Sequence, residues 1–236
     1  SYILLLKCDL HVSGRFKNGR VIDADCRQYY YDAKDEIVKI NGLTNGFKLY
    51  SNHDFHIDFS HYDTTNIIDM SKMFLGCMTL TYLDLSNFNS SNVTDMSKMF
   101  FACFQLTNLD VSNFDTRNVT NMKGMFDTAN FLVRLDLSNF DTKNVTNMER
   151  IFANCSSLRY LDVSNFDISN VTEMKEAFVN TSNLKYIKCK QSFKDWCIAN
   201  KSAIQMSDET INGTLYVKRV SYYDALKEII DKEENT

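Results

Sequence analysis

A phrase of 26 residues that recurs along the chain constrains its fold more than any other feature. Close copies begin at Leu83, Leu109, Leu135 and Leu161, and a looser copy begins at Ile57. Because the period is constant and no copy carries an insertion, each copy is expected to form one structural unit that stacks on the next. The five predicted units are residues 57–82, 83–108, 109–134, 135–160 and 161–186.

Two hydrophobic periodicities divide each unit into parts. In the second unit, Leu83 and Leu85 alternate with polar residues, which is the period of a strand. Met96, Met99 and Phe100 have the i, i+3, i+4 spacing of a short helical turn. Stacked in register, the units place their strands side by side in a parallel sheet, with the helical turns opposite. The sequence therefore predicts an α/β repeat fold in the form of a solenoid.

The two flanks of the chain do not follow the repeat. A solenoid needs a cap at each end because its terminal units would otherwise expose an apolar face to water. We therefore predict an N-terminal cap region at residues 1–56 and a C-terminal cap at residues 187–236. Within the second cap, residues 214–220 alternate like a strand, and residues 221–234 carry the apolar stripe and capping residues of a helix.

Composition and charge argue against some classes of partner. Hydrophobic residues make up 44% of the 236 residues, which is enough for a sizeable core. The net charge is −4 and no run of lysine or arginine is present, so no nucleic-acid partner is expected. The apolar run near the start, residues 3–6, is too short for a signal sequence or a membrane span, so we expect no direct membrane insertion by this chain. The chain begins at Ser1 without a methionine, which leaves open a leader or anchor removed before it.

Three of the seven cysteines, Cys77, Cys103 and Cys155, occupy one column of the repeat whose other members are Ala129 and Thr181. A column that accepts cysteine, alanine and threonine indicates small buried side chains, so these thiols are predicted to be inert. The other four cysteines lie in the flanks, where disulfide pairing stays open because it cannot be deduced from sequence. The two candidate pairs are Cys8–Cys26 and Cys189–Cys197.

Four strings recur in the units: Leu-x-x-Leu-x-Leu, Ser-Asn-Phe-Asp/Asn, Asn-Val-Thr-x-Met and Met-Phe-x-x-Cys. Over residues 57–188 these strings resemble the BspA-like leucine-rich repeats of bacterial surface proteins and lipoproteins. One departure is that phenylalanine, as at Phe88, stands where the common leucine-rich pattern has asparagine. The resemblance implies a parallel β-sheet on the concave face, a cell-surface or secreted location, and a role in adhesion or protein binding.

No constellation of catalytic residues emerges, so we expect a protein that is not an enzyme and that holds no cofactor or metal. The aspartates form one column, Asp58, Asp84, Asp110, Asp136 and Asp162, whose members are adjacent because of the register of the repeat. Like charges on neighbouring strands repel, so the column needs an explanation. Solvation helped by nearby arginines is one explanation, and a row of oxygen ligands for weakly bound calcium or for a cationic partner is the other.

A second polar column holds Asn66, Asn92, Asn118, Asn144 and Asn170. Asparagine amides at strand spacing can bond along the stack and to loop backbone, so a structural role is predicted. Four of these residues begin Asn-Val-Thr strings, which are formally glycosylation acceptors. Because the repeat itself generates this motif, we interpret it as accidental unless the source is eukaryotic.

Positions that change from unit to unit carry the prediction of a binding surface, because a scaffold does not need them to vary. They lie just before each strand and, in a leucine-rich arc, line the concave face beside the aspartate column. The predicted partner is a protein or other extracellular macromolecule of a host or a neighbouring cell. The predicted partner-binding residues are Tyr82, Asp84, Asp110, Arg134, Asp136, Arg159, Tyr160, Asp162 and Tyr186.

A second candidate patch is apolar and confined to the early units, where it serves either as the packing site of a cap or as a protein contact. Its residues are Leu75, Met78, Phe101, Phe104 and Phe131. The alternative function is a secreted effector or enzyme whose activity lies in residues 1–56, with the repeats as a targeting module.

Overall fold

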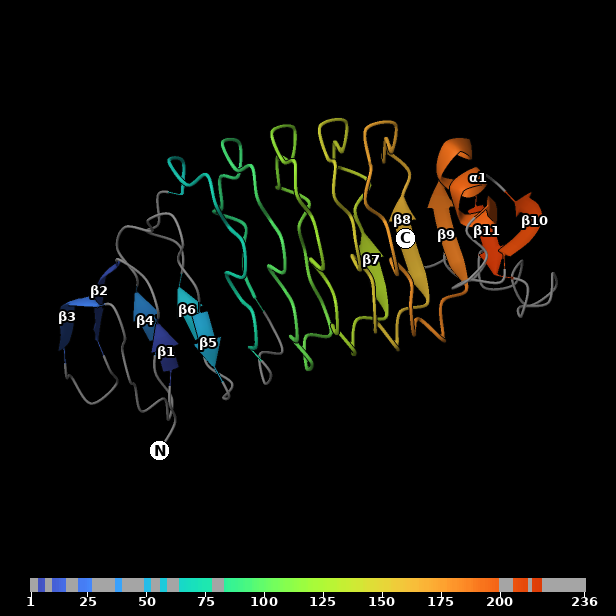
Figure 1. Cartoon of the computed structure of the whole chain (residues 1–236). Coiled ribbons are helices and arrows are strands. Elements are labelled where there is room, and N and C mark those ends of the chain that lie inside the picture. The colour runs from blue at the N-terminus through green and yellow to red at the C-terminus, as the bar shows by residue number, and fades with distance from the viewer. Residues whose placement is uncertain are drawn as a thin grey trace.

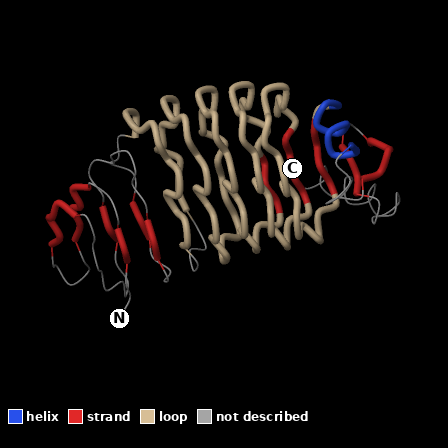
Figure 2. The backbone as a smooth tube through the Cα atoms, in the orientation of Figure 1, coloured by secondary structure: helices blue, strands red, loops and turns tan. Residues whose placement is uncertain are grey.

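The computed structural model describes the middle of the chain and short strands on either side of it (Figure 1). The backbone is described for residues 64–77 and 83–199, and side chains are described for the same residues except 198. Turns and loops make up most of this middle part (Figure 2). The elements are β1 (Leu4–Leu6), β2 (Leu10–Arg15), β3 (Val21–Cys26), β4 (Ile37–Lys39), β5 (Leu49–Ser51), β6 (His56–Asp58), β7 (Arg134–Asp136), β8 (Tyr160–Val163), β9 (Tyr186–Cys189), α1 (Gln191–Ala199), β10 (Met206–Ile211) and β11 (Thr214–Val217).

Strands β7, β8 and β9 lie side by side and parallel. Leu135 is opposite Leu161, and Leu161 is opposite Ile187, so residues 26 positions apart face one another. The predicted parallel pairing of successive units is therefore confirmed for these three. Strand β11 then pairs antiparallel with β9 and with β10, which completes a sheet in the order β10-β11-β9-β8-β7. Of the strand predicted at residues 214–220, residues 214–217 are present as β11, whereas residues 218–220 and the helix predicted at 221–234 lie outside the described residues.

The described residues before β9 run in successive coils that are bonded to one another through a second, shorter ladder (Figure 1). Single parallel bridges join one residue of each coil to the equivalent residue of the next. These bridges are Asp69–Asp95, Asp95–Asn121, Asn121–Asn147 and Asn147–Glu173. The coils are thus registered against their neighbours through these bridges, those that carry β7 and β8 also through their strands, and the register repeats every 26 residues.

After each bridge the chain makes consecutive tight turns. In the second coil, alternate N–H groups, from Met96 through Ala102, donate to carbonyl groups of the third coil at 2.8–3.0 Å. Of the N–H groups between them, that of Ser97 donates to the Asp95 carboxylate at 2.7 Å, and those of Met99 and Phe101 donate to the carbonyl three residues back, at 3.3 and 3.1 Å. The prediction of a helical turn here is therefore wrong, because alternate backbone N–H groups bond to the next coil and not within a helix. This bonding needs left-handed residues, and Lys98 and Ala102 have φ values of 55° and 59°.

A continuous ladder of phenylalanines fills the core. Centroids of neighbouring rings are 5.3–6.0 Å apart, and the rings are nearly parallel. The five ladder residues are Phe74, Phe100, Phe126, Phe152 and Phe178. Phe193 of α1 packs edge-on against Phe178 and Phe166, each at 6.1 Å, and is fully buried. Helix α1 therefore covers the apolar end of the stack.

The N-terminal strands pair among themselves. Strands β2 and β3 form an antiparallel pair, as do β1 and β5, whereas β4 lies parallel to β6 with Val38 opposite Ile57. Ile57 begins the first predicted unit, so a parallel strand already precedes the repeat. The sequence did not reveal this partner, because residues 37–39 lack the recurring phrase.

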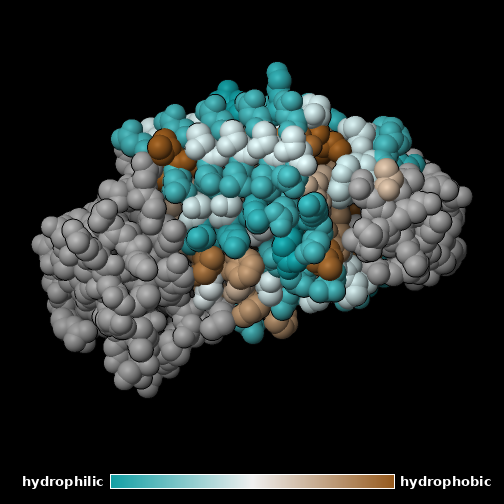
Figure 3. Space-filling view, in the orientation of Figure 1, coloured by the Kyte–Doolittle hydropathy of each residue, from teal (hydrophilic) through white to brown (hydrophobic). Residues whose placement is uncertain are grey.

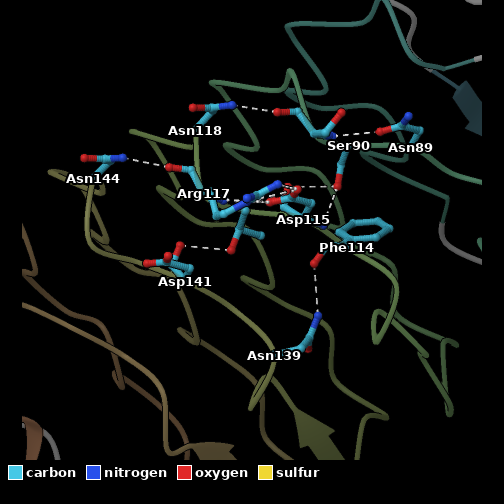
Figure 4. A network of polar contacts seen from close by, with 11 residues as sticks. Asn89, Ser90, Phe114, Asp115, Arg117, Asn118, Asn139, Asp141 and Asn144 are labelled. Carbon is cyan, nitrogen blue, oxygen red and sulfur yellow. Dashed lines mark hydrogen bonds and ion pairs between the residues drawn. The ribbon is translucent and has the colours of Figure 1, made fainter.

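Asparagine side chains tie the coils together. The Nδ2 of Asn118 donates to the carbonyl of Ser91 at 2.7 Å, one coil earlier (Figure 4). The equivalent pairs are Asn92 with Thr65, Asn144 with Arg117, and Asn170 with Lys143, at 2.7–2.8 Å. The predicted structural role of this column is therefore confirmed for these four residues. The amide nitrogen that glycosylation would need is already used as a hydrogen-bond donor.

Buried hydroxyl groups make a parallel set of bonds. The Oγ of Ser90 donates to the carbonyl of Asp115 at 3.0 Å and accepts from the N–H of the same residue at 2.8 Å (Figure 4). Thr142 bonds in the same two ways to Asp167, at 2.9 and 2.7 Å. These two buried hydroxyls are therefore satisfied by backbone of the following coil, whereas that of Thr181 donates to the carbonyl of Phe178 in its own coil at 2.7 Å.

The repeat cysteines are buried, as predicted. Cys77, Cys103 and Cys155 are at most 1% exposed, and burial raises the pKa of Cys155 to about 12 and that of Cys103 well above its usual value. The thiols of Cys103 and Cys155 therefore stay protonated and unreactive. Cys189 and Cys197 are both free, so the candidate disulfide between them is not formed, and the pair Cys8–Cys26 lies outside the described residues. Within the part that the structure describes, no helix has the length and hydropathy to span a bilayer.

Candidate functional site

Six residues form the outward face of β7–β9. Along β7, Arg134 and Asp136 are exposed, whereas Leu135 between them is buried. Strand β8 continues this alternation, whereas in β9 Tyr186 is buried and Lys188 is exposed. The parallel register aligns these residues with Arg134 and Asp136 of β7. The two outward rows are Arg134–Tyr160–Tyr186 and Asp136–Asp162–Lys188.

The first row is a stack of side chains. The guanidinium carbon of Arg134 lies 4.5 Å from the centroid of the Tyr160 ring, and the rings of Tyr160 and Tyr186 stack at 5.0 Å with 18° between their planes. Exposure falls along the row, from exposed Arg134 through half-buried Tyr160 to Tyr186 at 4%. A partner can therefore reach Arg134 and Tyr160, while Tyr186 acts as the support on which Tyr160 packs.

Arg159, the residue just before β8, is exposed beside this row. The carbonyl of Val133 accepts hydrogen bonds from the N–H groups of both Arg159 and Tyr160, at 2.9 and 3.2 Å. One carbonyl oxygen is thus shared by two donors, while the pairing of β7 with β8 stays regular from Arg134 to Asp136. The same arrangement recurs one coil later, where the carbonyl of Arg159 accepts from Lys185 and Tyr186 at 3.0 Å each.

The aspartate column caps turns. The Oδ1 atoms of Asp84, Asp110, Asp136 and Asp162 each accept the N–H of the serine two residues later, at 2.9–3.0 Å. Hydrogen bonds with Ser112 hold the pKa of the Asp110 carboxyl below its usual value. Turn capping therefore explains why an aspartate recurs in this column, and neither of the two explanations based on sequence included it.

The geometry does not favour the calcium alternative at this column. One carboxylate oxygen of each aspartate is directed to its own backbone, and the carboxylates come from separate coils. Among the described side chains, no group of three or more His, Cys, Asp or Glu residues could hold a metal ion.

One protein-family model matches the chain twice, over residues 41–134 and 100–213. That family is described as a Mycoplasma protein of unknown function, DUF285. The chain belongs to the DUF285 family. The two matches overlap within the repeats, as expected for a model that spans several copies of one unit. Comparisons with curated proteins and with solved structures give no match.

Two other predicted contact residues of this DUF285 chain lie on coils before the Arg134–Tyr160 stack. Asp84 and Asp110 are exposed on earlier coils, and Tyr82 lies outside the described residues. Sequence reasoning missed Lys188, whose ammonium lies 3.3 Å from the carboxylate of Asp162. The signal for Lys188 was available, because it lies 26 residues after Asp162 in the aspartate column.

The second candidate patch is only partly exposed among its described residues. Phe131 is 47% exposed, whereas Leu75, Phe101 and Phe104 are half-buried and Met78 lies outside the described residues. The ammonium of Lys98 lies 5.6 Å from the centroid of the Phe101 ring. The visible described surface consists of rows of like hydropathy that run across the coils, with hydrophobic residues in small separate groups (Figure 3).

A buried polar cluster interrupts the apolar columns near this patch. Asp127 is 2% exposed and accepts from Arg150 Nε at 2.9 Å and from Asn154 and Thr128 at 2.8 Å each. Arg150 also pairs with Glu176. Because its carboxylate oxygens are engaged within the cluster, Asp127 has a structural role. An aspartate where the previous coil has Phe101 was the sequence signal for it.

Proposed function

We propose that the chain is a non-enzymatic binding module of a bacterial surface or secreted protein, built as a BspA-like leucine-rich-repeat solenoid. The outward face of β7–β9 is the binding surface and lies on the concave side. The partner is a protein or another extracellular macromolecule. The parallel register of β7, β8 and β9 supports the fold, and membership of the DUF285 family is compatible with the BspA-like type.

The observation that carries this proposal is the stack of Arg134 on Tyr160. Arginine and tyrosine are enriched among the residues that contribute most to protein interfaces. Tyr160 is already packed on Tyr186, so binding orders fewer side-chain rotamers and costs less entropy. Stacking of the coils does not require this pair, because the same column holds Asn108 in an earlier unit.

The alternative, an effector or enzyme centred on residues 1–56, stays a prediction, because side chains of that region lie outside the described residues.

The test is binding of the full chain to a panel of purified extracellular-matrix and cell-surface proteins, measured by biolayer interferometry. The double variant Arg134→Ala plus Tyr160→Ala is expected to lose at least about tenfold in affinity for any protein that the wild type binds. Unchanged affinity of this variant would reject the outward face as the binding surface.

Two further variants locate the site. Arg117→Ala removes another exposed arginine, one that is paired with Asp115, and is expected to bind like the wild type. Phe104→Ala plus Phe131→Ala tests the apolar patch. Loss of binding in this second variant alone would move the site to the patch, and thermal melting shows whether each variant is folded.

A further inference from the structure

The described arginines fall into two classes. Arg117 lies 2.7 Å from a carboxylate oxygen of Asp115, and Arg150 is held by Asp127 at 2.9 Å. Within residues 64–77 and 83–197, by contrast, no carboxylate lies in ion-pair distance of Arg134 or Arg159. Both of these arginines are exposed, and both border the outward face of β7–β9.

Arg134 is positioned to receive a carboxylate. Its guanidinium is held over the Tyr160 ring, which reduces the conformational freedom that binding would otherwise remove. A guanidinium placed over a ring keeps N–H groups at its edge, and this planar fork matches the two oxygens of a carboxylate. Arg159 adds a second cation on the neighbouring strand.

The local charge favours an acidic ligand even though the chain as a whole is acidic. The two outward rows, together with Arg159 and Lys185, carry four cationic and two anionic side chains, while the net charge of the chain is −4. Of the two aspartates, Asp162 is already balanced by Lys188 at 3.3 Å. A positive patch on an acidic molecule gives an acidic partner both an attraction and an orientation.

The spacing of the two arginines sets the shape of the ligand. Arg134 and Tyr160 are paired across neighbouring strands, and Arg159 is one residue earlier than Tyr160. With strands about 4.8 Å apart and about 3.3 Å per residue, the two arginine backbones are about 6 Å apart. In an extended peptide, side chains two residues apart point to the same side at a separation of about 6–7 Å.

We propose that the partner presents an acidic, extended peptide segment to this face, with carboxylates two residues apart that bind Arg134 and Arg159. The inference rests on the proposed function, because it names the chemistry of the macromolecule recognised by the same surface. The aromatic ring of Tyr160 contacts the residue between the two carboxylates or the peptide backbone beside it.

The probe is a blocked, fluorescein-labelled peptide of alternating glutamate and serine, compared with the same peptide carrying glutamine in place of glutamate. Fluorescence anisotropy is measured while the full chain is added at low and at higher salt. Wild type is expected to bind the glutamate peptide and to lose affinity with salt. Arg134→Gln and Arg159→Gln are each expected to weaken binding at least about fivefold, whereas Arg117→Gln, the matched control, leaves it unchanged.

Equal binding of the two peptides, or an equal loss in Arg117→Gln, overturns the proposal. A third arm uses heparin: binding of heparin that depends on Arg134, with no binding of the glutamate peptide, also overturns it and assigns a sulfated polysaccharide instead. The peptide assay and the macromolecule assay fail independently. If the chain captures a protein through Arg134 and Tyr160 but does not bind the peptide, the proposed binding surface stands and the acidic-peptide proposal fails. If capture does not depend on Arg134 and Tyr160, the proposed binding surface itself is rejected.

Discussion

The molecule contains two aromatic stacks that both arise from the repeat, one in the core and one on the outward face. Inside, Phe100, Phe126 and Phe152 stack at 5.7 and 6.0 Å and are fully buried. Outside, Tyr160 and Tyr186 stack at 5.0 Å, and Arg134 lies over the exposed end. Both stacks exist because the repeat places equivalent residues one above the other.

The two stacks differ in whether every coil must keep the same residue in the column. The inner stack runs through five coils with the same residue, because every layer must fill the same space against the next. The outer stack is limited to three coils and uses arginine and tyrosine. Register alone therefore makes aromatic stacks, and departure from the repeated residue marks the surface that is available for recognition.

The largest expected effect separates the two stacks directly. Phe126→Ala removes a fully buried ring and leaves a cavity, so a loss of about 3–5 kcal/mol in unfolding free energy is expected. Tyr160→Ala removes a half-buried ring from a cross-strand pair and is expected to cost about 1 kcal/mol or less. Urea denaturation followed by circular dichroism measures both. Similar losses in the two variants would contradict the distinction between the core and the outward face.

Removal of a buried carboxylate should lower the unfolding free energy more than removal of an exposed one. Asp127→Ala leaves the N–H groups of Arg150 and Asn154 without their buried acceptor, so a loss of about 2 kcal/mol is expected. Asp115→Ala, which breaks the exposed pair with Arg117, is the control and should cost clearly less. The same denaturation series compares the two, and a larger loss in the exposed pair would show that the buried cluster is not stabilising.

The smallest expected effect concerns the backbone of the turns. Ala102 has a φ of 59°, a conformation that glycine adopts without the steric cost of a β-carbon. Ala102→Gly is therefore expected to raise the unfolding free energy by up to about 1 kcal/mol. Ala153→Gly, at a buried position with ordinary backbone, should lower it by about 0.5–1 kcal/mol. The two melting temperatures should move in opposite directions.

Register was predictable from the sequence because it depends only on the period. Leu135, Leu161 and Ile187 pair as their spacing requires, and the amide of Asn118 bonds to the neighbouring coil. The turns were not predictable in the same way. The spacing of Met96, Met99 and Phe100 buries the same side chains whether the backbone is helical or turned. Only the bonding of alternate N–H groups to the next coil decides between them.

The candidate site was predictable as a set of positions but not as a surface. Arg134 and Tyr160 share a column, so their proximity follows from the period. The burial of Tyr186 depends on packing at the end of the stack, where the repeat stops. Periodicity carries no information about that end, because no further copy of the phrase defines the neighbours there.

The hydrogen bonds that join the turns of successive coils align peptide dipoles along the stack. The N–H groups of Met70, Met96, Met122 and Met148 all donate toward the following coil, and the carbonyls that receive them point back. Each peptide unit carries a dipole of about 3.5 D, and dipoles aligned in series add, as they do along a helix. On this edge the positive pole lies at the last coil, so the two ends of the array differ electrostatically. An array lengthened by further coils would separate those poles in proportion to the number of coils added.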